Sequence, residues 1–144
     1  MLKNLDPLLS PDLLHVLRAM GHGDEIVIVD ANFPAESSGP RVVRLDGVTA
    51  TAALDAVLSV MPLDEFVPEA AWRMEVVGAP DEEQPIFDEF REIISAREGA
   101  AFKLASLERF EFYKHASACY AVVATGERRL YGNIILKKGV VRPE

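Results

Sequence analysis

The stretch Ile26-Val27-Ile28-Val29-Asp30 decides the fold of this 144-residue chain. Four consecutive β-branched aliphatic residues predict a strand buried on both faces, because a strand with one wet face alternates apolar and polar side chains. Strands of this kind are typical of parallel sheets that helices cover on both sides. The stretch therefore predicts an α/β domain in which Asp30 emerges at the carboxyl end of a buried strand.

Helical and strand patterns alternate on both sides of this stretch. Helices are predicted at about 11–20, 49–61, 86–98 and 107–118, the first capped by Ser10 and the last with Phe110 and Tyr113 facing inward. Further strands are predicted at 41–45, 72–77, 102–105, 121–124 and 134–136. The expected architecture is a single domain over residues 1–144, a three-layer α/β/α sandwich with a mostly parallel central sheet.

Composition and charge exclude several classes of partner. The chain has 15 basic and 23 acidic residues, a formal charge of −8 that repels nucleic-acid phosphates and anionic membrane surfaces. Its one cysteine, Cys119, cannot form an internal disulfide, and prolines and acids interrupt the apolar residues near the amino terminus. The apolar runs fall far short of the roughly 18 residues that cross a membrane. We expect a cytoplasmic protein with no nucleic-acid or membrane partner.

The basic residues concentrate near the carboxyl terminus. Residues 128–143 contain no acid and five basic residues, which are Arg128, Arg129, Lys137, Lys138 and Arg142. Two interpretations remain open. The segment is either a solvated basic edge or a surface that docks on an acidic region of a neighbouring subunit.

Gly21-His22-Gly23-Asp24 is the first candidate for chemistry. The glycines allow a sharp turn just after a predicted helix, and the negative end of that helix favours a protonated histidine. His22 could therefore donate a proton near neutral pH. The alternative is a simple helix stop with a solvated histidine.

Two further candidates lie near strand ends. Ligands of open α/β sheets bind beyond the carboxyl ends of the strands, which is where Asp30 stands, although an aspartate there is also an ordinary turn residue. Tyr131-Gly132-Asn133 precedes the last strand and offers hydroxyl and amide groups that suit a polyol, or else forms a hairpin end. Arg109, among aromatic residues, is either a forked donor or a surface residue.

Motifs for metals and nucleotides are weak or missing. His115 and Cys119 are four residues apart, but a zinc site needs further ligands. The sequence has no glycine-rich phosphate loop, and residues 78–83 place three carboxylates at the helix start where an anion would bind. Trp72 could stack on a sugar, but in a strand it is more often a core residue. No metal or cofactor is expected.

Taken together and in order, several blocks resemble the RbsD/FucU family of sugar mutarotases, which contains L-fucose mutarotases and D-ribose pyranases. The resemblance covers residues 1 to about 141 and rests chiefly on AlaMetGlyHisGlyAspGluIle, ValAspAlaAsnPheProAla, ArgPheGluPheTyr and TyrGlyAsnIleIleLeuLysLysGlyVal.

The resemblance implies an isomerase that interconverts the α and β anomers of a free monosaccharide without a cofactor. It implies His22 as the proton donor, and as sugar-binding residues it implies Asp30, Arg109, Tyr131, Gly132 and Asn133. Ribose pyranases tend to have histidine at the position of Arg109, so this residue favours L-fucose. The general base remains open between Asp30, Tyr131 and a water. The family also implies a homodecamer with sites near subunit boundaries. A ribose pyranase and a non-catalytic sugar-binding oligomer are the alternatives.

Overall fold

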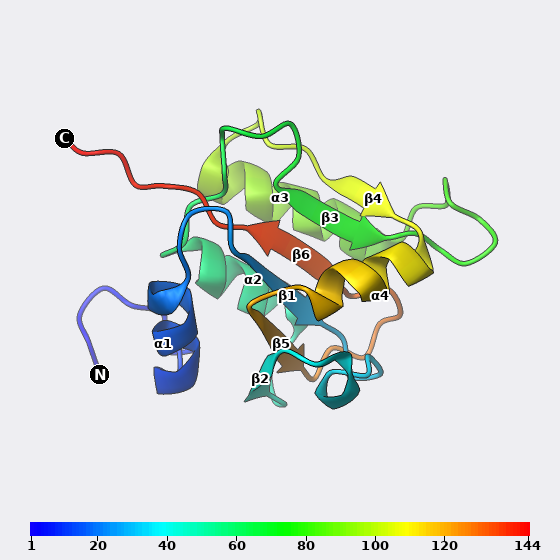
Figure 1. Cartoon of the computed structure of the whole chain (residues 1–144), viewed down its shortest axis with the longest axis horizontal. Helices are drawn as coiled ribbons and strands as arrows, with labels where there is room; N and C mark the ends of the chain where they lie inside the picture. The colour runs from blue at the N-terminus through cyan, green and yellow to red at the C-terminus, as the bar shows by residue number, and fades with distance from the viewer.

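The strand predicted from Ile26 to Val29 is β1 (Glu25–Val29), and it lies inside a six-stranded sheet in the computed structural model, which describes residues 1–144 (Figure 1). The sheet order is β2-β5-β1-β6-β3-β4. The other strands are β2 (Arg41–Leu45), β3 (Ala71–Met74), β4 (Ala105–Leu107), β5 (Ala121–Thr125) and β6 (Ile134–Lys137). Only β6 runs antiparallel to its neighbours, β1 and β3, and the remaining pairs are parallel. The predicted mostly parallel sheet is confirmed.

Helices cover both faces of the sheet (Figure 1). They are α1 (Pro11–Ala19), α2 (Ala50–Leu58), α3 (Pro85–Glu98) and α4 (Arg109–Ser117), with a short 3-10 turn, η1 (Glu36–Ser38). Helices α2 and α3 pack together behind the sheet, α1 lies beside them, and α4 lies in front. The predicted cap of α1 forms, because the Ser10 hydroxyl accepts the Leu13 N–H at 3.2 Å.

The two faces of β1 contribute to different cores. Ile26 and Ile28 point into the larger core, formed with α1, α2 and α3. Val27 and Val29 point into a smaller core, formed with residues of α4 such as Phe112. This burial on both sides is what the unbroken aliphatic run predicts, and the three-layer architecture follows from it. No helix is long and apolar enough to cross a membrane.

Two boundary predictions and one prediction of a buried helix face were wrong. Residues 102–104 are not a strand, and β4 begins only at Ala105 because Phe102 and Leu104 pack on the larger core instead. Strand β3 ends at Met74, before a turn that contains Gly78 at a φ of 75°. On α4 the inward residue is Phe112, whereas Phe110 is 63% exposed.

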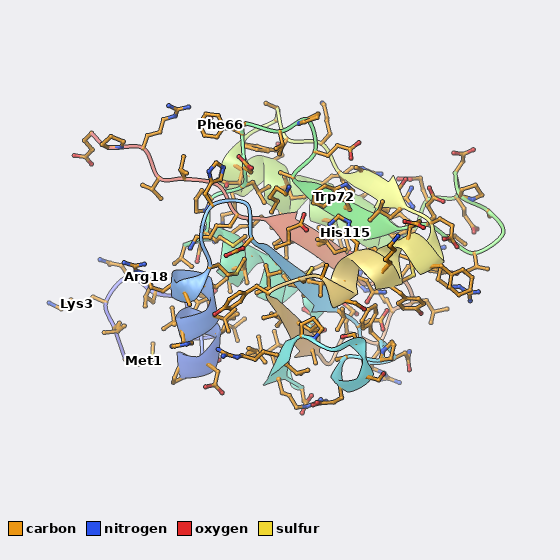
Figure 2. The ribbon with its side chains drawn as sticks, in the orientation of Figure 1. Met1, Lys3, Arg18, Phe66, Trp72 and His115 are labelled. Carbon is orange, nitrogen blue, oxygen red and sulfur yellow. The ribbon has the colours of Figure 1, made fainter.

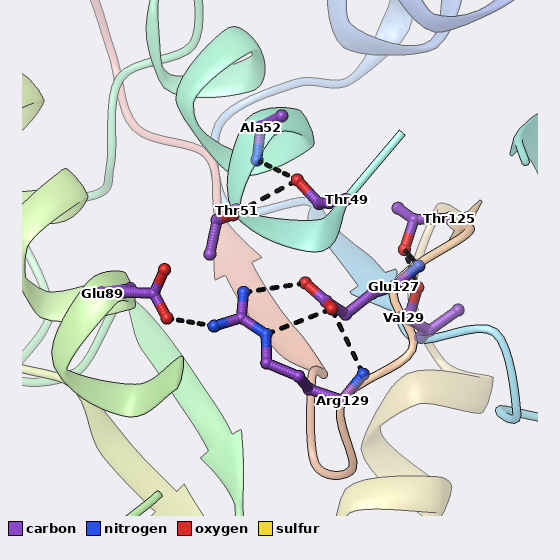
Figure 3. Close-up of polar contacts among 8 residues, drawn as sticks. All are labelled: Val29, Thr49, Thr51, Ala52, Glu89, Thr125, Glu127 and Arg129. Carbon is purple, nitrogen blue, oxygen red and sulfur yellow. Dashed lines mark hydrogen bonds and ion pairs between the residues drawn. The ribbon is translucent and has the colours of Figure 1, made fainter. Parts of the chain in front are cut away.

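Four of the five basic residues near the carboxyl terminus have partners within the chain. Arg129 bridges the carboxylates of Glu127 and Glu89, as Figure 3 shows. The Lys138 ammonium donates to two carbonyl oxygens at the end of α1, and Arg142 pairs with Glu65 at 2.7 Å. Lys137 lies 4.0 Å from Glu25. These contacts favour a basic edge satisfied within the subunit over docking on an acidic neighbour.

Candidate active site

A cavity of about 220 Å³ opens where β1 ends, between the loop that follows it, helix α4 and the loop before β6. Four of the residues predicted to bind sugar line it, which are Asp30, Arg109, Tyr131 and Asn133. They come from three separate segments of the chain. The volume is below the roughly 300–1,000 Å³ of sites for drug-sized ligands and suits a single small molecule.

Asp30 is held firmly at the edge of the cavity. Its backbone N–H donates to the Asn133 side-chain oxygen at 2.9 Å, and its carboxylate accepts the Asn32 N–H at 3.0 Å. Burial raises the pKa of Asp30, and the hydrogen bonds from Asn32 and Asn133 only partly offset that rise. A buried, oriented carboxyl group with a raised pKa is suited to hydrogen bonding and proton transfer.

Tyr131 presents its hydroxyl to the same region. The oxygen accepts the Val77 N–H at 3.1 Å, so the hydroxyl proton is free to be donated to a ligand. The backbone of Tyr131 has a φ of 61°, which is uncommon for a residue other than glycine. Such strain persists where the surrounding structure fixes it, and it is found disproportionately at functional sites.

Gly132 does not line the cavity, although its neighbours do. A Cβ atom at this position would lie 2.8 Å from the Glu127 side chain and 3.2 Å from that of Ile86. Its backbone N–H is among the groups that hydrogen-bond Asp30 and oppose the rise of that residue's pKa. The glycine is therefore explained by packing of the loop, with an indirect contribution to the site.

Arg109, the first residue of α4, has an unsatisfied donor. Its Nε atom is buried and has no hydrogen-bond partner, while the guanidinium carbon lies 4.5 Å from the centre of the Phe110 ring. Buried N–H groups without a partner are uncommon in native structures. Arg109 also lines the cavity, so its side chain borders the space that a ligand would occupy.

Several other lining residues were not predicted from the sequence. Phe33 and Tyr113 form an aromatic wall, with ring centres 5.4 Å apart, and Asn32 and Leu130 complete the rim. One signal could have identified Tyr113, since it stands four residues after Arg109 and so shares its helix face. Trp72 is not in this cavity. It is buried in the smaller core beside His115 (Figure 2).

His22 lies at the other end of β1, in the loop between α1 and β1. Its side chain is 45% exposed, and its Nε2 atom is 3.0 Å from an oxygen of Asp64, a buried residue. The His22 ring also packs on Phe66, with ring centres 5.6 Å apart. His22 is therefore a paired and oriented histidine, and the predicted solvated helix stop does not describe it.

One subunit does not bring His22 and Asp30 together. The five residues of β1 separate its ends by roughly 13 Å, at about 3.3 Å per residue. A proton donor must come within roughly 3 Å of the atom that it protonates, or act through one water. Within a single chain, the cavity thus has binding groups and a carboxyl group but not the predicted proton donor.

The cysteine is not part of the site. Cys119 lies beyond the end of α4 and is buried, and burial raises the pKa of its thiol. No group of three or more histidine, cysteine, aspartate or glutamate residues could hold a metal ion. What the cavity offers is an arrangement of neutral and charged donors and acceptors next to an aromatic wall, which matches the hydroxyl groups and apolar faces of a monosaccharide.

Comparisons with known proteins agree with this chemistry. The human fucose mutarotase is 49% identical to this chain, and the alignment covers 97% of this chain and 94% of that protein. A fucose mutarotase from Streptococcus pneumoniae, solved in complex with L-fucose, is 44% identical and superposes with a TM-score of 0.92 over 98% of this chain and all of that one. RbsD from Bacillus subtilis, solved with D-ribose, shares the fold at 24% identity and a TM-score of 0.75, over 99% of this chain and all of that one. Residues 3–141 match the model of the RbsD / FucU transport protein family, and the chain belongs to that family.

Proposed function

We propose that this protein interconverts the α and β anomers of L-fucose, as an isomerase acting on a free sugar. The observation that carries the proposal is the cavity that gathers Asp30, Arg109, Tyr131 and Asn133. The fucose mutarotases to which this chain is 44–49% identical support L-fucose as the substrate. Arg109 supports the same choice, because ribose pyranases of the family that the sequence resembles tend to have histidine at this position.

The reaction needs one acid and one base. Ring opening transfers a proton to the ring oxygen while the anomeric hydroxyl loses its proton, and the bond between the anomeric carbon and the ring oxygen breaks. Closure on the opposite face of the resulting aldehyde reverses both transfers and yields the other anomer. We assign His22 as the acid, and Asp30, Tyr131 or a water held by them as the base. Such general acid–base assistance contributes about 10²- to 10⁴-fold.

We propose that His22 reaches the sugar from a second copy of the chain. Within one subunit β1 separates it from the cavity, so the proton donor must come from elsewhere. Exposed apolar side chains flank both parts, with Val77 and Leu130 near the cavity, and Phe66 beside His22. Contact between two unlike surfaces of identical chains forms a ring when the rotation from one copy to the next closes. We therefore propose a homo-oligomer, a decamer as the family resemblance implies, with sites between its subunits.

The proposal also covers location and partners. A cytoplasmic location fits the unpaired, buried Cys119, since thiols stay reduced in the cytosol. The formal charge of −8 fits a neutral sugar as ligand, because it disfavours phosphorylated sugars and nucleic acids.

Saturation-transfer NMR on L-fucose tests the activity. Irradiation of the anomeric proton of one anomer should reduce the signal of the other in proportion to the protein added. His22→Ala should abolish that transfer while sugar binding persists. If the wild-type protein gives no transfer, the mutarotase proposal is wrong. If it gives transfer only between the pyranose and furanose forms of D-ribose, the pyranase alternative takes its place.

A further inference from the structure

The turn after β5 contacts the backbone on both sides of Asp30. The Thr125 hydroxyl donates to the Val29 carbonyl oxygen at 2.7 Å and accepts the Glu127 N–H at 3.2 Å (Figure 3). The Glu127 carbonyl oxygen in turn accepts the Ala31 N–H at 2.9 Å. Val29 and Ala31 are the neighbours of Asp30 in the chain. Hydrogen bonds from this one turn therefore fix the backbone immediately before and immediately after Asp30.

Glu127 is buried in this turn, and its carboxylate has all its partners within the chain. The side chain is only 4% exposed. One carboxylate oxygen accepts the backbone N–H and the Nε–H of Arg129, each at 3.2 Å, and the other accepts an Nη2–H at 3.0 Å (Figure 3). Burial by itself would raise the pKa of Glu127, but the hydrogen bonds and the charge of Arg129 outweigh burial and hold that pKa below its ordinary value. Because Arg129 also pairs with Glu89 of α3, the turn is attached to a helix.

The Glu127 side chain also contacts the segment before β6. A Cβ atom on Gly132 would lie 2.8 Å from Glu127 Cγ, so the backbone at Gly132 packs directly on this side chain. The next residue, Asn133, lines the cavity and accepts the Asp30 N–H at 2.9 Å. Glu127 itself does not line the cavity. It contacts two of the segments that build the cavity from behind them.

We propose that Glu127, together with Thr125, is a positioning residue that fixes the Asp30 carboxyl group toward the sugar. The inference rests on the proposed function. A group that binds the sugar or takes its proton must stay within hydrogen-bond distance, and a displacement of about 1 Å can lower a rate roughly a hundredfold. Glu127 and Thr125 exchange no proton with the sugar. They act through the backbone of residues 29–31.

Two substitutions at Thr125 separate positioning from packing. Thr125→Val keeps the approximate shape of this buried side chain but removes the hydroxyl that joins Val29 to Glu127. The kcat/KM for L-fucose exchange should therefore fall roughly ten- to a hundredfold. Thr125→Ser keeps the hydroxyl and loses a buried methyl group. It should recover most of that kcat/KM, although its midpoint of urea unfolding should be lower than that of the wild type.

Amide hydrogen exchange, measured without sugar, reports the positioning itself. Mass spectrometry of a peptide that spans residues 29–34 should show faster exchange in Thr125→Val than in the wild type, because the Ala31 N–H is bonded to the displaced turn. Thr125→Ser should resemble the wild type. Glu127→Gln should resemble Thr125→Val in this peptide and in kcat/KM, since its amide NH₂ would face the N–H donors of Arg129.

Asp55→Asn is the matched control for Glu127→Gln. The Asp55 carboxylate also forms a forked pair with an arginine, at 2.8 and 3.0 Å from Arg97 Nε and Nη2, but this pair joins α2 to α3 and does not contact the turn or β1. Its loss should leave kcat/KM and the 29–34 peptide unchanged.

A role in folding alone predicts different results. In that case kcat/KM per folded protein would be the same in Thr125→Val, Thr125→Ser and the wild type, and the inference would be overturned. Unchanged amide exchange of the 29–34 peptide in Thr125→Val would also overturn it. Absence of wild-type sugar exchange would instead reject the proposed function, while the peptide measurement would still show whether the turn holds the backbone at Asp30.

Discussion

At the scale of single residues, the position of Asp30 serves the site but reduces the stability of the protein. Its carboxyl group ends a buried strand and faces a cavity, so the structure orients it at the cost of its hydration. Burial raises its pKa, and hydrogen bonds from Asn32 and Asn133 only partly offset the rise. Ionised Asp30 therefore lowers the free energy of unfolding at neutral pH, because its charge is better solvated in the unfolded chain.

Asp30→Asn should consequently stabilise the protein at neutral pH while it impairs exchange. As pH rises from acid, the unfolded chain loses the Asp30 proton first, near its ordinary pKa of 3.8, and the native protein loses it later. The gain in the free energy of unfolding from Asp30→Asn should therefore be absent well below pH 3.8. It should reach its full size above the raised pKa of the native protein. Urea unfolding of both proteins across the acid range measures it. A variant that is less stable at neutral pH would contradict this view of Asp30.

Tyr131→Phe tests the other polar group at the cavity. The lost hydroxyl accepts only the Val77 N–H, which is exposed and can bond to water instead, so the free energy of unfolding should change by less than about 1 kcal/mol. The KM for L-fucose should rise roughly tenfold through the lost hydrogen bond to the sugar. A fall in kcat as well would identify Tyr131 as the base. Unchanged kinetics would remove Tyr131 from the site.

At the scale of elements, one close approach positions the loop that carries Asp64. Gly139 follows β6 and donates its N–H to the Pro62 carbonyl oxygen at 2.8 Å. A Cβ atom on Gly139 would collide with the backbone of Leu63, and it would lie 2.9 Å from the Asp64 Cα. The segment after β6 and the loop before β3 can pack this closely only because residue 139 has no side chain.

Gly139→Ala should therefore push the 62–64 segment away from β6. We expect a loss of about 1–3 kcal/mol in the free energy of unfolding and slower exchange, since Asp64 and His22 would shift together. Gly47→Ala is the control, because a Cβ at Gly47 would meet no atom within 4 Å. Equal stability of the two variants in urea would show that the approach at Gly139 is not a constraint.

Strands and helices were predicted correctly where their side chains are fully buried. The predictions were wrong where burial is partial. Strands β1 and β5 have β-branched runs buried on both faces, so their sequence alone marks them. Strand β4 has only three residues and one neighbour, β3, and its limits depend on that pairing rather than on its own pattern. The inward face of α4 was mispredicted because aromatic residues occur on several of its sides, and tertiary contacts select Phe112.

At the scale of the whole molecule, the sequence predicted most residues that line the cavity. It did not predict where those residues and His22 lie relative to one another. Asp30, Arg109, Tyr131 and Asn133 were predicted and do line one cavity. The pairing of His22 with Asp64 could not be predicted, because 42 residues separate them and no local motif links them. Nor did the sequence reveal that the length of β1 keeps His22 from the cavity of its own subunit. That separation is the reason to expect a site assembled from two copies.

The proposed active site therefore requires an oligomer. Solution mass measurement should find no monomer at working concentrations, and variants that disrupt assembly should lose exchange while each chain stays folded. Phe66→Asp is such a variant, because Phe66 is 58% exposed beside His22 and its loss removes little from the core of its own chain. A monomeric protein with full exchange activity would refute a shared site.

Complementation between two inactive variants tests the central claim most directly. His22→Ala and Asp30→Asn, each purified alone, should show almost no transfer between the L-fucose anomers. When both are co-expressed with different tags and purified as mixed oligomers, random assembly should restore about a quarter of the sites, each combining an intact cavity from one copy with His22 from another. Recovery near that level is the predicted result. Mixed oligomers that remain as inactive as either parent would contradict a sugar-isomerising site shared between subunits.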